Sequence, residues 1–111
     1  MKFSESLKRN EDFRRVYGKR QSFANKYFIM YILNNNSSIN RLGISVSKKV
    51  GNSVVRHRVV RLVRESYRLN EDRFNSGLDM VVVARSTAAT IDYKAAESAL
   101  LHLAKLHGVL L

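Results

Sequence analysis

The sequence predicts a single-domain α+β fold over residues 1–111, an α/β sandwich in which a small mixed sheet carries helices on both faces. First, 111 residues with 45% hydrophobic side chains suffice for one core. Second, segments with the periodicity of strands alternate with segments of helical periodicity. Third, two strand segments are apolar on both faces, so each face of the sheet needs a covering layer.

A short helix is predicted over residues 11–17, and Asn10 is placed to cap it. Its apolar side chains are Phe13, Val16 and Tyr17, at i, i+3, i+4 spacing. Two uses of this stripe remain open. It can dock the helix on the sheet, or it can present aromatic rings to a ligand.

Two strands follow, joined by a polar loop over residues 34–40. The first, 22–33, is rich in aromatic and β-branched side chains and is predicted as one long strand. Its alternating faces carry two sets: Tyr27, Ile29 and Tyr31, and Phe28, Met30 and Ile32. The second strand spans 41–49, with Leu42, Ile44 and Val46 on one face. Because the intervening loop is short, an antiparallel hairpin of neighbouring strands is predicted.

Residues 48–68 predict a turn at Gly51 and then a helix that Asn52 or Ser53 can cap. At 100° per residue, one side of this helix is apolar: Val55, Val59, Leu62 and Val63. The nearly opposite side is basic: His57, Arg61, Arg64 and Arg68. Arg58 flanks the basic stripe, and Arg56 lies toward its other edge.

The last elements are a strand and a helix. Residues 78–85 form a continuous apolar run, which is typical of a central strand buried on both faces. Asp92 can cap a closing helix over residues 93–107, and Gly108 is placed to end it. The predicted core side chains of this helix are Ala96, Leu100, Leu103 and Ala104.

The charge balance points to an anionic partner. Lys and Arg number 20 against 9 Asp and Glu, a formal net charge of +11, and a polyanion commonly offsets such an excess. A long apolar run, a signal peptide and a lipidation motif are all absent, so we expect a cytoplasmic protein without a membrane partner. The sequence has no cysteine, which excludes thiolate catalysis and Cys-ligated metals. No motif for protein-borne catalysis or a protein metal site is found.

An arginine face opposite an apolar face suits a phosphate backbone, because guanidinium groups bind phosphate bidentately. Charge alone does not separate RNA from DNA. Aromatic rings near the basic segments favour single-stranded nucleic acid, since such rings stack on unpaired bases.

Residues 41–65, RLGISVSKKVGNSVVRHRVVRLVRE, closely resemble the signature of the bacterial ribonuclease P protein component. Residues 10–33 resemble the N-terminal helix and long strand of that family, and DMVVVAR (79–85) resembles its last strand. The resemblance implies a ribosomal protein S5 domain 2-like fold, with a left-handed βαβ crossover over residues 41–85. Physical rules alone favour a right-handed one.

The resemblance also implies the function. The chain would be the protein subunit of ribonuclease P, which assists a catalytic RNA in removing the 5′ leader from precursor tRNA. The partners would be the ribonuclease P RNA subunit and precursor tRNA. The catalytic groups and Mg²⁺ would belong mainly to the RNA, and the protein would lower the Mg²⁺ requirement.

Two sets of site residues follow from the resemblance. The RNA-binding set on the turn and arginine-rich helix is Lys48, Lys49, Asn52, Arg56, His57, Arg58, Arg61, Arg64 and Arg68. The leader-binding cleft set is Phe13, Tyr17 and Tyr31. His57 stands where the family usually has Asn, and Val60 stands where Lys is common.

Two other functions remain as alternatives. One is a stand-alone basic RNA-binding module, such as a small ribosomal protein or an RNA chaperone. The other, a protein-only nuclease, is disfavoured because the sequence shows no acidic metal cluster.

Overall fold

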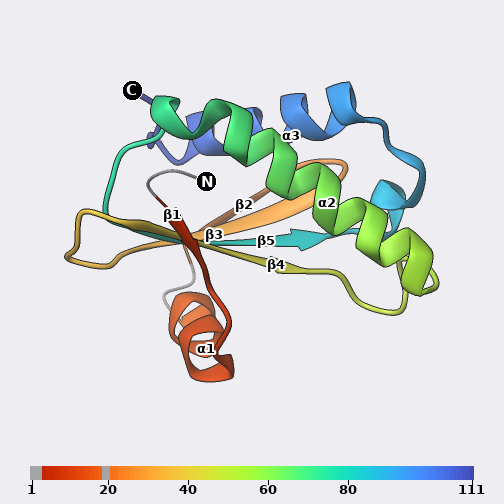
Figure 1. Ribbon diagram of the computed structural model, residues 1–111, viewed down its shortest axis with the longest axis horizontal. Coiled ribbons are helices and arrows are strands. Elements are labelled where there is room, and N and C mark those ends of the chain that lie inside the picture. The colour runs from red at the N-terminus through yellow and green to blue at the C-terminus, as the bar shows by residue number, and fades with distance from the viewer. Residues whose placement is uncertain (1–3, 19–20) are drawn as a thin grey trace.

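The computed structural model describes residues 4–18 and 21–111. Its strands are β1 (Ser4–Ser6), β2 (Ser22–Ala24), β3 (Phe28–Asn34), β4 (Asn40–Ser45) and β5 (Leu78–Ala84). Its α-helices are α1 (Asn10–Gly18), α2 (Ser53–Asn70) and α3 (Tyr93–Leu106), and two short 3₁₀ helices are η1 (Glu71–Arg73) and η2 (Ser86–Thr90). Figure 1 shows α1 on one face of the sheet and α2 with α3 on the other, as predicted.

The five strands form one mixed sheet in the order β1-β4-β5-β3-β2. The central strand, β5, runs antiparallel to β3 and parallel to β4. The short β1 extends the sheet by pairing in parallel with β4. Its three residues carry too little periodicity to be predicted from the sequence.

The predicted hairpin between the second and third strand segments is wrong, because β5 lies between β3 and β4. The loop that joins them instead passes the start of β5, where the amide of Asn35 donates to the carbonyl of Gly77 over 2.9 Å. β5 is buried along almost its whole length. Its apolar side chains therefore gain most from a central position with a strand on each side.

The predicted long strand 22–33 is also wrong in part, because it folds back on itself as β2 and β3. The side chain of Asn25 makes the turn: its Oδ1 accepts hydrogen bonds from the amides of Tyr27 (3.1 Å) and Phe28 (3.0 Å). Tyr27 consequently precedes β3 and packs on the side of the sheet that α2 and α3 cover, whereas Tyr31 packs on the side of α1.

Two hydrophobic clusters hold the layers together. The larger lies between the sheet and helices α2 and α3; among its fully buried members are Phe28, Met30, Val59, Val63, Tyr67, Val82 and Leu103. The smaller lies under α1 and has Leu7, Val16 and Val81 as its buried members. The predicted core faces of α2 and α3 are therefore confirmed, with Val55 and Leu62 half-buried at the border of the larger cluster.

The predicted helix ends are largely confirmed. The Asn52 side chain caps α2 by accepting from the amide of Val55 (3.0 Å), and Asp92 caps α3 in the same way. Gly108 has a φ of +71°, the left-handed conformation expected after a helix. By contrast, Asn10 lies inside the first turn of α1, because the carbonyl of Arg9 already accepts from the amide of Phe13.

The crossover between the parallel strands β4 and β5 runs through α2. In Figure 1, with β1 nearest the viewer, the chain runs right along β4, rises into α2, returns left and enters β5 behind β4. This path is left-handed, as the family resemblance implied and against the general rule. None of the helices in the described residues has both the length and the apolar character needed to span a bilayer.

Candidate nucleic-acid interface

The turn before α2 presents the first basic side chains. Val50 is buried and anchors the turn, while Lys48 and Lys49 beside it are exposed. Gly51 follows where the chain passes close to the helix: a Cβ at this position would lie 2.8 Å from Cγ1 of Val55. The turn therefore fixes the start of α2 and leaves both lysines in solvent.

The exposed face of α2 carries the centre of the predicted basic stripe. His57, Arg61 and Arg64 are exposed, and together with Val54 and Val60 they line a shallow hollow of about 450 Å³. Within the described residues, neither arginine has an ion pair or hydrogen bond from its side chain. An apolar floor with unpaired guanidinium groups around it can accept a phosphate or the face of a base.

The other predicted arginines of α2 have different surroundings. Arg58 is half-buried, and its guanidinium donates to the carbonyls of Ala89 (3.3 Å) and Ile91, so this side chain ties α2 to η2. Arg68 pairs with Glu65 one turn earlier, and the hydrogen bond from Arg68 lowers the pKa of that carboxyl.

Arg56 is half-buried and has no hydrogen-bond or ion-pair partner among the described side chains. The structure thus separates the predicted arginines. Arg58 acts within the fold, whereas Arg61 and Arg64 are available to an external anion.

A cleft of about 480 Å³ lies between α1 and the end of β4, lined by Asn10, Phe13, Arg14, Tyr17, Ile44 and Ser45. The Phe13 ring rests directly on the backbone of Gly43. A Cβ at that glycine would lie 2.6 Å from Cζ of the ring. A glycine at this position therefore lets α1 approach the sheet closely enough to form one wall of the cleft.

The structure brings the three predicted cleft aromatics together. The ring of Tyr17 lies 6.3 Å from that of Phe13 and 4.9 Å, edge to face, from that of Tyr31. All three rings are half-buried, whereas Val16 between them is fully buried. Val16 thus docks the helix, while Phe13 and Tyr17 line the cleft and Tyr31 packs against Tyr17.

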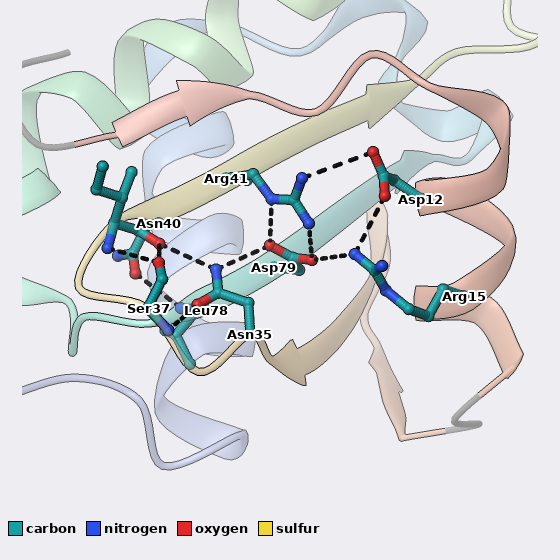
Figure 2. Close-up of polar contacts among 9 residues, drawn as sticks. Asp12, Arg15, Asn35, Ser37, Asn40, Arg41, Leu78 and Asp79 are labelled. Atoms are coloured by element: carbon teal, nitrogen blue, oxygen red, sulfur yellow. Dashed lines mark hydrogen bonds and ion pairs between the residues drawn. The ribbon is translucent and has the colours of Figure 1, made fainter.

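Sequence reasoning missed several residues of this region. Asn10, Arg14 and Ser45 line the cleft, and a helical projection of α1 combined with the alternation of β4 could have found them. Sequence reasoning also missed Asp79. A single acid within an apolar strand indicates a buried ion pair. Figure 2 shows its carboxylate surrounded by Arg41, Arg15 and Asn35.

The protonation states in this cluster are well defined. Burial raises the pKa of Asp79, but hydrogen bonds from Arg41, Asn35 and Arg15 outweigh it, and the net pKa lies below its ordinary value. The hydrogen bond to Asp79 correspondingly raises the pKa of Arg41. Asp79 and Arg41 therefore form an ionised pair at neutral pH.

The described residues do not fit a resident divalent cation. No group of three or more His, Asp or Glu side chains gathers anywhere in residues 4–18 and 21–111. The carboxylates of Asp12 and Asp79, which lie under α1, are paired with Arg15 and Arg41.

Comparison with known proteins agrees with these features along nearly the whole chain. The family model described as Ribonuclease P matches residues 1–107. A ribonuclease P protein component from Lachnoclostridium phytofermentans is 62% identical over 107 residues, 96% of this chain and 92% of that protein. One from Alkaliphilus oremlandii is 55% identical over 105 residues, covering 95% and 92%.

Solved structures show the same agreement. The RNase P protein of Staphylococcus aureus superposes with a TM-score of 0.87 at 36% identity, covering 96% of this chain and 97% of that one. The Thermotoga maritima protein gives 0.83 at 30% identity, covering 91% and 96%. These matches favour the ribonuclease P function over a stand-alone RNA-binding module or a protein-only nuclease. The chain therefore belongs to the bacterial ribonuclease P protein component family and is a subunit of an endoribonuclease.

Proposed function

We propose that the chain binds the ribonuclease P RNA through the exposed basic face of α2 and holds the single-stranded 5′ leader of precursor tRNA in the cleft beside α1. One observation carries this proposal: the cleft and the basic face are joined by the turn over residues 46–52. Ser45 lines the cleft, Lys48 and Lys49 follow it, and Asn52 then caps α2. A bound leader and the RNA subunit can therefore contact one continuous surface.

The two surfaces suit different parts of the RNA. In the cleft, Phe13 and Tyr17 can stack on unpaired leader bases, a contact worth about 1–3 kcal/mol per base. Arg14 at the rim is exposed and can bind a leader phosphate. On α2, Arg61 and Arg64 can bind phosphates of the RNA subunit. The stacking contacts give preference for precursor tRNA, since the mature tRNA has no leader.

Mg²⁺ enters this proposal as a cofactor of the RNA. The described carboxylates of the protein do not fit the ion, and the chemistry is left to the RNA subunit, with tRNA maturation taking place in the cytoplasm. Cationic side chains near the phosphates reduce their mutual repulsion, which lowers the Mg²⁺ concentration that the folded RNA needs. With about 6–10 phosphates neutralised, RNA affinity falls about 10³–10⁵-fold between about 50 and 200 mM salt.

Phe13→Ala tests the cleft. We expect weaker binding of precursor tRNA by the holoenzyme and nearly unchanged binding of mature tRNA, because only the precursor places bases against the ring. Phe23→Ala is the matched control, since Phe23 is an exposed phenylalanine on the edge strand β2, which β5 and β3 separate from β4. Equal losses for precursor and mature tRNA in Phe13→Ala would mean that the ring serves only the core.

A further inference from the structure

Helix α1 presents two different sides to the sheet. Val16 is fully buried at the centre of the contact. At about 100° per residue, Asp12 and Arg15 lie to one side of Val16, and Phe13 and Tyr17 lie to the other. A small rotation of the helix about Val16 would therefore move the polar pair and the cleft aromatics together.

On the polar side of α1, Arg15 contacts the carboxylate of Asp79, which is fully buried in the central strand β5. Nη2 of Arg15 lies 3.0 Å from Oδ2 of Asp79 and 3.1 Å from Oδ1 of Asp12. Arg41 holds the same carboxylate from β4, with Nε 2.8 Å from Oδ1 and Nη2 2.6 Å from Oδ2. Asn35 donates to Oδ1 from the loop after β3 (2.9 Å), as Figure 2 shows.

The carboxylate of Asp79 has a fixed position on the sheet. Arg41 and Asp79 face each other in the register of β4 and β5, so their pairing is set by the strands themselves. The contacts of Val16, Phe13 and Tyr17 with the sheet are apolar and non-directional, and they tolerate small rotations of the helix. The bonds from Arg15 are charge-assisted and directional, and they supply the missing restraint.

We propose that Asp79, Arg41 and Arg15 form a clamp that sets the rotation of α1 on the sheet and so places Phe13 and Tyr17 in the cleft. Arg15 is then a positioning residue for leader recognition and not a contact to RNA. The part of this inference that concerns the leader rests on the proposed function of the cleft. The part that concerns the rotation of α1 does not.

The charge of the cluster supports this division of roles. Two carboxylates, Asp12 and Asp79, offset two guanidinium groups, Arg15 and Arg41, so the cluster offers no net charge to a phosphate. Arg14, the next residue along the same helix, lines the cleft without an ion pair among the described residues. It is the matched control, because it differs from Arg15 in role while sharing its helix and its charge.

The rotation of α1 can be measured without RNA. The sequence contains no cysteine, so two introduced thiols take spin labels selectively. Glu11→Cys on α1 and Ser98→Cys on α3 are both exposed positions. Electron–electron double resonance should give a narrow distance distribution for the doubly labelled parent and for its Arg14→Ala variant, and a broadened or shifted one for Arg15→Ala. Arg15→Lys keeps the charge and should recover part of the parent distribution.

Binding to reconstituted holoenzyme tests the consequence for the leader. For Arg15→Ala we expect the ratio of precursor to mature tRNA affinity to fall about tenfold, comparable to the loss of one stacked base. The salt dependence of that ratio should stay as in the parent, because no phosphate contact is removed. Arg14→Ala should instead reduce the slope of log affinity against log salt for the precursor by about 0.7.

The outcomes separate the two proposals. An unchanged distance distribution in Arg15→Ala overturns the clamp. A slope of log precursor affinity against log salt that falls in Arg15→Ala as much as in Arg14→Ala also overturns it. A changed distribution with the parent precursor preference overturns its role in leader recognition. A parent protein that does not distinguish precursor from mature tRNA overturns the proposed function of the cleft, and the distance measurement then still decides whether the clamp orients α1.

Discussion

Gly43→Ala introduces a methyl group at the closest approach between α1 and the sheet. The new Cβ would lie 2.6 Å from Cζ and 2.8 Å from Cε1 of Phe13, and 3.2 Å from Cβ of Leu7. Carbon atoms in favourable contact are about 3.5–4.0 Å apart. The ring of Phe13 must therefore move by roughly 1 Å, and because it is half-buried it can move into the cleft.

The expected magnitude follows from two opposing effects. Overpacking of this kind costs about 1–3 kcal/mol. Replacing glycine by alanine also reduces the freedom of the unfolded chain, which contributes about 0.4–1 kcal/mol in the opposite direction. We expect the free energy of unfolding to fall by about 0.5–2 kcal/mol, and the preference of the holoenzyme for precursor tRNA to fall about tenfold as the ring narrows the cleft.

Urea titration measures the first effect and tRNA binding the second. Gly18→Ala is the matched control, because no described atom lies within 4 Å of a Cβ built at Gly18. Its free energy of unfolding should stay within about 0.5 kcal/mol of the parent. A Gly43→Ala protein that is as stable as the parent, or more stable, and keeps its precursor preference would refute the close contact between Phe13 and β4.

Two further predictions concern other side chains. The pKa of Asp79 lies below its ordinary value, so the stability that its ionised carboxylate contributes is complete above about pH 4 and is lost as the pH falls through the folded-state pKa. In urea titrations, the difference in free energy of unfolding between the parent and Asp79→Asn should therefore narrow below about pH 4. Arg58→Ala should lower the free energy of unfolding by about 1.5–3 kcal/mol through its lost bonds to η2, whereas Arg64→Ala should leave it nearly unchanged and instead reduce the salt slope of RNA binding by about 1.

The elements with strong local signals could be predicted from the sequence. α2 and α3 each combine a polar cap, an apolar stripe and an identifiable end, and both lie where predicted. β5 was identified as central because its apolar run fits only a strand buried on both faces. These features depend on interactions within a few residues of each other, or on burial alone.

The sheet order could not be predicted in the same way. A short loop between two strands favours a hairpin, but here burial of β5 outweighs that local preference and separates β3 from β4. The turn at Asn25 was missed because its hydrogen bonds depend on one side chain within an otherwise strand-like segment. The handedness of the crossover came from the family resemblance and not from physical rules.

The candidate site was predicted in outline. Periodicity identified the basic face of α2, and the resemblance identified the aromatics of the cleft. The separation of Arg58 from Arg61 and Arg64 depends on η2, a segment that no periodicity predicts. The clamp at Asp79 depends on the pairing of β4 with β5 and on the docking of α1, which are both tertiary features.

Reconstitution at low Mg²⁺ tests whether this chain assists the catalytic RNA of ribonuclease P. The purified chain is added to ribonuclease P RNA transcribed in vitro, with precursor tRNA as substrate, and release of the 5′ leader is measured as Mg²⁺ is lowered. We expect the chain to restore cleavage at Mg²⁺ concentrations at which the RNA alone is slow, and we expect Arg61→Ala with Arg64→Ala to remove much of this gain. No gain in cleavage from the parent chain, or cleavage by the chain without the RNA, would contradict the proposed function.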